Sequence, residues 1–123
     1  MRWTTKYKQE IKSHRAIKPL LLRLEEKGWK VKFVKWVNKR VDGYCDARKR
    51  EIVIVSSRNR EVYYPRTMKR LAWILAHEYR HAWQQENNKY LAYIYGHDIR
   101  DKEISENDAN EFADRYIKNF WES

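Results

Sequence analysis

Apolar residues in the first thirty positions recur at helical spacing. Residues 5–16 carry Tyr7 and Ile11 four positions apart among several lysines, which predicts a basic helix. Pro19 should end or kink this helix, because the residue before a proline is disfavoured in the α region. Proline is also a good first residue for the next helix. A run of leucines follows Pro19, and Gly28 is suited to end this second helix.

The period changes after the second predicted helix. Residues 31–36 alternate loosely between apolar side chains and lysines, which is typical of a half-exposed strand. Asp42-Gly43 predicts a turn, and residues 44–47 predict a second short strand. The run 51–55 is rich in β-branched residues on both faces, so we expect it to be the most buried strand. Joined in sequence order, these segments predict a three-stranded meander.

Two longer helices are predicted in the second half. Pro65 and Thr67 mark the start of one, and residues 88–103 form a tyrosine-rich connection. The last helix should begin near Ile104 or Ser105. Its apolar stripe has spacings of three and four and consists of Ala109, Phe112, Ala113, Tyr116, Ile117 and Phe120.

This order of elements predicts an α+β fold in a single domain over residues 1–123, with residues 1–18 as a basic helical lead-in. A chain of 123 residues is long enough for one core and too short for two. The single cysteine, Cys45, excludes an intrachain disulfide and fits a reducing compartment, and we interpret it as an inert thiol. No apolar run resembles a signal peptide or spans a membrane, so we expect a cytoplasmic protein.

Charge is unevenly distributed along the chain. Residues 1–60 contain 18 Lys/Arg and 6 Asp/Glu, whereas residues 61–123 contain 9 and 11. A basic half suggests a polyanionic or acidic partner, although it also fits a well-solvated surface. The residues that we expect to contact nucleic acid, if it binds, are Lys30, Lys32, Lys35, Lys39 and Arg40.

The most specific pattern is His-Glu-x-x-His at residues 77–81, inside a predicted helix. Positions i and i+4 share one helix face, so His77 and His81 can reach one Zn²⁺ at about 2.0–2.1 Å. Glu78 can then act as the general base for a zinc-bound water. Two unrelated surface histidines are the alternative, but the chain has only four histidines and the flanking residues are apolar.

A catalytic zinc ion needs a third protein ligand and one open position. The residues alone leave two candidates open. Glu106 lies near the start of the last predicted helix, and His97 lies in the connection, 16 residues after His81.

The segments AHEYRHAWQ and ENDANEFA together resemble the ImmA/IrrE family of zinc metallopeptidases. Such proteins pair HExxH with a later helix bearing Glu-x-x-Ala-Asn-x-Phe-Ala, and the likeness covers roughly residues 20–121. The resemblance implies a minimal zincin-like domain of the gluzincin type, with one Zn²⁺ on His77, His81 and Glu106. It also implies a protein substrate, such as a DNA-bound regulator. A weaker likeness to the SprT group rests on HExxH and Gly96-His97. This likeness implies His97 as the third zinc ligand.

Several other residues have two interpretations each. The resemblance implies that Asn110, one turn beyond Glu106, orients a ligand, whereas it could also be an ordinary polar helix residue. Tyr93, Tyr95 and His97 could contact substrate or an oxyanion, or could simply pack. Arg80 replaces the small or apolar residue often found at this position of the motif, and its side chain could extend to solvent.

The sequence therefore predicts a zinc-dependent metallopeptidase that hydrolyses peptide bonds in a protein substrate. The alternative is a basic, nucleic-acid-associated module of the same fold with weak or no peptidase activity.

Overall fold

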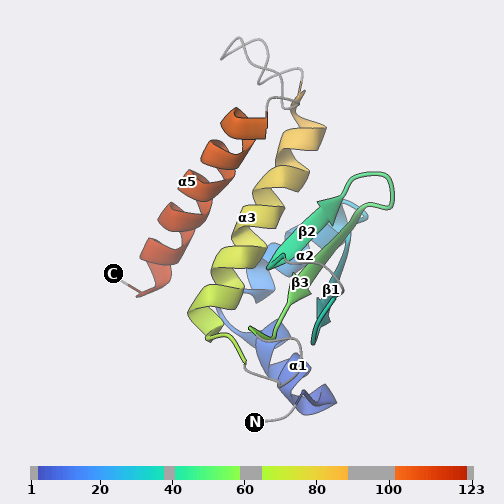
Figure 1. The fold of residues 1–123 in the computed structure, drawn as a ribbon, viewed down its shortest axis with the longest axis vertical. Coiled ribbons are helices and arrows are strands. Elements are labelled where there is room, and N and C mark those ends of the chain that lie inside the picture. Colours follow the sequence, from blue (N-terminus) through green and yellow to red (C-terminus); the bar gives the residue numbers. More distant parts are fainter. Residues whose placement is uncertain (1–2, 38–40, 59–64, 89–101, 122–123) are drawn as a thin grey trace.

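A computed structural model describes residues 3–37, 41–58, 65–88 and 102–121. Within these ranges the chain forms helices and one small mixed sheet, which confirms the α+β expectation (Figure 1). The elements are α1 (Thr5–Ser13), α2 (Lys18–Glu26), β1 (Lys30–Val34), β2 (Gly43–Asp46), β3 (Glu51–Val55), α3 (Met68–Glu86) and α5 (Lys102–Trp121). No helix in this described part is long and apolar enough to cross a membrane.

The two N-terminal helices begin and end near the predicted residues. The Thr4 hydroxyl accepts a hydrogen bond from the backbone N–H of Tyr7 and caps α1, which ends at Ser13 rather than residue 16. Pro19 lies in the first turn of α2, and Gly28 follows its end with a φ of 82°. The apolar sides of both helices are buried, so they cover part of the core.

The sheet has the order β1-β3-β2, so the predicted meander is wrong. β1 runs parallel to β3, with Lys30 opposite Glu51, and β2 runs antiparallel to β3. β3 is the strand that is apolar on both faces, and its residues 52–55 are almost completely buried, as expected. A strand of this kind is most stable in the centre with a partner on each side, whereas lysine-bearing β1 is suited to an edge.

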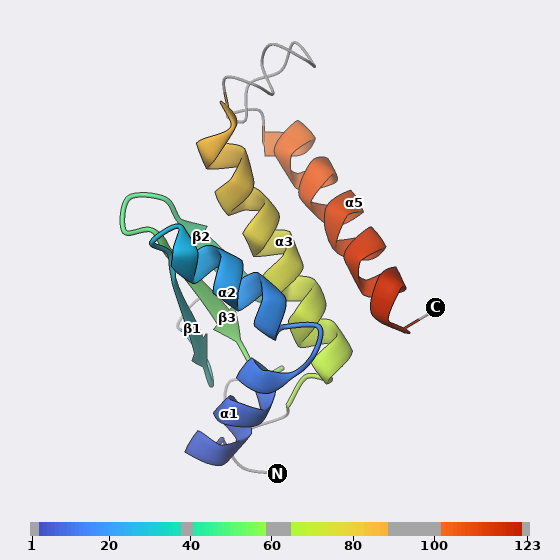
Figure 2. The ribbon, with the colours of Figure 1, turned by 180° about the vertical axis from the view of Figure 1, so that it is seen from behind.

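Helix α3 lies between the sheet and α5, and α3 and α5 run side by side in opposite directions (Figures 1 and 2). The Thr67 hydroxyl caps α3 by accepting from the backbone N–H of Arg70. Ala109 and Ala113 of α5 are fully buried, and these small side chains allow the two helices to approach closely. We call this contact surface the α3–α5 seam.

Helix α5 begins at Lys102, slightly before the predicted Ile104 or Ser105. The apolar stripe starts later than the helix, and Glu103 in the first turn interacts favourably with the helix dipole. A polar first turn therefore extends the helix beyond its buried stripe.

Strand β2 is held close to α3 at its start. Asp42 accepts hydrogen bonds from Arg66 and from Arg70, each at 2.8 Å. A Cβ atom on Gly43 would lie 2.8 Å from the carbonyl oxygen of Val53 and 3.0 Å from the Ile74 side chain, so only glycine fits there without a shift. These contacts bring one edge of the sheet beside the middle of α3.

Candidate metal centre

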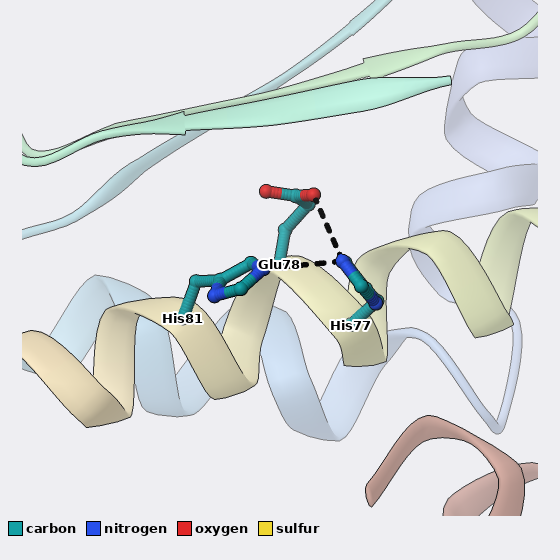
Figure 3. Close-up of side chains that lie close together, drawn as sticks. All are labelled: His77, Glu78 and His81. Atoms are coloured by element: carbon teal, nitrogen blue, oxygen red, sulfur yellow. Dashed lines mark hydrogen bonds and ion pairs between the residues drawn. The ribbon is translucent and has the colours of Figure 1, made fainter. Parts of the chain in front are cut away.

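The HExxH motif occupies the middle of α3, as the pattern predicts. The Nε2 atoms of His77 and His81 lie 3.1 Å apart, and the two rings are almost perpendicular. Glu78 extends from the same helix toward the sheet, and its Oε1 lies 3.8 Å from Nε2 of His77 (Figure 3). Helical spacing thus brings two imidazoles and one carboxylate to the same place.

Glu106 reaches this group from α5. Its Oε2 lies 3.2 Å from Nε2 of His77, and its Oε1 lies 2.9 Å from Nε2 of His81. Glu106 precedes the buried Ala109 by about one turn, so close packing of the seam fixes its position opposite the histidines. Of the two candidates for a third ligand, Glu106 lies within the described residues and contacts both histidines, whereas His97 lies outside them.

Glu78 is the buried acid of the group. The residue is only 6% exposed, and burial, followed by the charge of Glu106, raises the pKa of its carboxyl to about 8. Two carboxyl groups in one small space repel each other when both are ionised. A bound cation would remove this repulsion and favour the charged form of Glu78.

His77 is biased toward its neutral form. Burial, followed by the proximity of His81, lowers the pKa of its imidazole, while Glu106 and Asn110 oppose that shift. Asn110 is exposed on α5 and is close enough to influence His77, although Nδ1 of His77 has no hydrogen-bond partner of ordinary geometry. The Trp73 ring stacks on the His77 ring, with 5.2 Å between the ring centroids. Neutral imidazole is the form that binds metal ions.

Sequence reasoning missed a polar group beside His81. Nδ1 of His81 lies 2.9 Å from Oε1 of Gln84, and Gln84 also contacts Asp108 of α5. Arg80 does not extend into solvent. It forms two hydrogen bonds with Asp108, at 2.7 and 3.2 Å, and its guanidinium lies 3.7 Å from the Trp83 ring centroid. The unusual Arg80 was the only sequence signal of this group.

Asp108 carries the negative charge of that group. Burial alone would raise the pKa of its carboxyl, but hydrogen bonds from Arg80 and Gln84, together with the charge of Arg80, lower it. Asp108 is therefore a stable anion that links α5 to α3.

A cleft of about 300 Å³ borders the centre. Its walls include Tyr44 and Cys45 of β2, Glu78 and His81 of α3, and Glu106 of α5. Burial, followed by the charge of Glu78, raises the pKa of the Cys45 thiol to about 12, which fits the expected inert thiol and disfavours a thiolate ligand.

The predicted basic residues within the described ranges are not part of this group. Lys30, Lys32 and Lys35 are exposed, and Lys32 forms an ion pair with Glu51 at 3.2 Å. The remaining predicted residues lie outside the described ranges, namely His97, Tyr93, Tyr95, Lys39 and Arg40.

The donor set matches the requirements of zinc. Ligand atoms at 2.0–2.1 Å around a tetrahedral ion are about 3.3 Å apart. The two Nε2 atoms lie 3.1 Å apart, and each lies 2.9 or 3.2 Å from a different carboxylate oxygen of Glu106. Two imidazoles and one carboxylate also form one of the ligand sets of catalytic zinc, which keeps a fourth position open. The side chains could therefore hold such an ion beside the cleft.

Comparisons of the chain with protein-family models, with curated proteins and with solved structures find no match. What the chain does is therefore inferred from the geometry of these side chains.

Proposed function

We propose that the chain is a zinc-dependent metallopeptidase of the gluzincin type. One observation carries the proposal: Glu106 of α5 lies 2.9–3.2 Å from the two Nε2 atoms that the HExxH motif places on α3. A chance HExxH on a surface helix would not have a carboxylate from another helix aligned with both histidines. The same residue, Glu106, is the ligand that the ImmA/IrrE resemblance implies.

The residues have distinct roles in this proposal. His77, His81 and Glu106 would hold one Zn²⁺, which would supply a Lewis acid and lower the pKa of a bound water. Glu78 is the general base, because its carboxylate lies beside the ligands and also borders the cleft. Glu78 would accept a proton from the water whose oxygen adds to the peptide carbonyl carbon, and would deliver that proton to the amide nitrogen as the C–N bond breaks.

The edge of the sheet supports a peptide substrate. In the strand order β1-β3-β2, β2 lies at an end of the sheet, and Gly43, Tyr44 and Cys45 of β2 line the cleft. An extended peptide can add to such an edge through main-chain hydrogen bonds, which would place a peptide bond beside Glu78. A protein substrate, such as the DNA-bound regulator implied by the resemblance, fits this arrangement.

The test compares wild type with Glu78→Gln on a denatured protein mixture, with new peptide termini identified by mass spectrometry. We expect the wild type to generate termini and Glu78→Gln to generate them at least about 10²-fold more slowly. Zinc content should be the same in both proteins, since Glu78 is not a ligand in this proposal. Equal cleavage by both proteins would show that Glu78 is not the base.

A further inference from the structure

Gln84 is a buried polar side chain in the α3–α5 seam, only 2% exposed. A buried amide is costly unless its hydrogen-bonding groups are satisfied. Gln84 contacts three partners: Nδ1 of His81 at 2.9 Å, the carbonyl oxygen of Ser105 at 2.9 Å and Oδ2 of Asp108 at 2.8 Å. The amide therefore connects a proposed zinc ligand on α3 to two positions on α5.

The chemistry of these partners fixes the orientation of the amide. The Ser105 carbonyl and the Asp108 carboxylate can only accept hydrogen bonds, so the amide end that faces both of them must be the NH₂ group. The other end, Oε1, can only accept, so Nδ1 of His81 must carry a proton and donate it.

This orientation decides which atom of His81 is free for a metal. A neutral imidazole with its proton on Nδ1 has its lone pair on Nε2. Nε2 is the atom that lies 3.1 Å from His77 and 2.9 Å from Glu106. The seam thus selects the tautomer in which the Nε2 lone pair of His81 and the carboxylate of Glu106 would both face a bound cation.

Arg80 holds Asp108, the α5 carboxylate that Gln84 contacts. Its guanidinium donates to both carboxylate oxygens of Asp108 and packs on Trp83. Asp108 cannot rotate away from Gln84 without losing this two-point contact. In the described part of the chain, Nδ1 of His77 has no hydrogen-bond partner of ordinary geometry, although Asn110 lies near this ring.

We propose that Gln84 is the positioning residue for the metal centre: it holds His81 in the tautomer and rotamer that bind zinc, and Arg80 and Asp108 hold Gln84. The inference rests on the proposed function and adds a determinant of metal affinity that HExxH does not include. A glutamine that only filled space would affect folding and leave the His81 tautomer and the zinc affinity of the folded protein unchanged.

The test measures the zinc dissociation constant by competition with a chromophoric chelator. Gln84→Met keeps the length of the side chain and removes its hydrogen bonds, and we expect zinc affinity to fall about 10- to 100-fold. Gln85→Met, at the next and exposed position, is the matched control and should stay within about twofold of wild type. Circular dichroism checks that both variants are folded. Unchanged affinity in folded Gln84→Met would overturn the inference.

A second measurement tests the predicted His81 tautomer even if Gln84→Met does not fold. Long-range ¹H–¹⁵N correlation spectra of the metal-free wild type at alkaline pH report which nitrogen of His81 carries the proton. A proton on Nδ1 is expected, and a proton on Nε2 would overturn the inference. Wild-type protein that binds no zinc would overturn the proposed function and this inference together, whereas tight wild-type binding with unchanged Gln84→Met affinity would overturn this inference alone.

Discussion

The α3–α5 seam and the edge strand β1 both carry charged side chains, but these are arranged very differently. In the seam, Glu106 and Asp108 of α5 each meet specific partners on α3 at 2.7–3.2 Å. On β1, Lys30 and Lys32 are exposed, and the Lys32 side chain stays 58% exposed in its ion pair with Glu51, whose side chain is 17% exposed. A binding site therefore needs several groups that converge on one point, whereas a high local charge needs only an accessible surface.

Removal of a histidine from the seam should have the largest effect. His77→Ala or His81→Ala leaves at most two of the three proposed ligands, so we expect zinc binding to be lost. Elemental analysis of the purified proteins measures it, with His14→Ala in the N-terminal region as the control that keeps about one zinc per chain. Full zinc occupancy in either seam variant would refute the ligand assignment.

Glu106→Ala should weaken zinc binding strongly, by a factor of about 10² or more, because a charged ligand is lost and water replaces it. Glu103→Ala, one turn earlier on α5, removes the same charge from an exposed position and should leave zinc affinity unchanged. His97→Ala should also leave it unchanged. If His97→Ala loses zinc and Glu106→Ala retains it, the SprT-like interpretation is the better one.

The same chemical change in the two regions should affect stability differently. Asp108→Asn breaks the two-point contact with Arg80 in the seam and should lower the free energy of unfolding by about 1 kcal/mol, a value reduced by partial exposure. Glu51→Gln breaks the ion pair with the exposed Lys32 side chain and should cost less than about 0.5 kcal/mol. Urea denaturation measures both values. Equal losses would show that the seam has no special electrostatic role.

The smallest effect is expected for the basic surface. Replacement of Lys30, Lys32 and Lys35 by alanine should make the protein elute from a DNA column at lower salt, because phosphate contacts release counterions. The control carries the same loss of charge on α5: Lys102→Ala, Arg115→Ala and Lys118→Ala. A wild type that is not retained even at low salt would remove nucleic acid as a partner of this surface.

Local signals predicted most of the elements. Gly28 ends α2, Thr67 caps α3, and the β-branched run 51–55 is the central strand. Each of these depends on a few neighbouring residues, which a sequence pattern records directly. The parallel pairing of β1 with β3 was not predictable in the same way, because it depends on which strand has two apolar faces and on long-range contacts.

The HExxH motif of the candidate site was predictable from the sequence, but the side chains that hold its residues in place were not. Spacing placed His77, Glu78 and His81 together, and the resemblance added Glu106. The role of Gln84 depends on the register between α3 and α5, which brings Asp108 within 2.8 Å of it from 24 residues away. No local pattern encodes that register, since it follows from how closely the buried alanines pack.

In the proposed function, His77, His81 and Glu106 hold one zinc ion between α3 and α5. Anomalous diffraction from zinc-loaded crystals, recorded on both sides of the zinc absorption edge, locates that ion. We expect one peak at about 2.0–2.1 Å from Nε2 of His77, Nε2 of His81 and a carboxylate oxygen of Glu106. A peak bound by His97, with Glu106 turned into solvent, would contradict it.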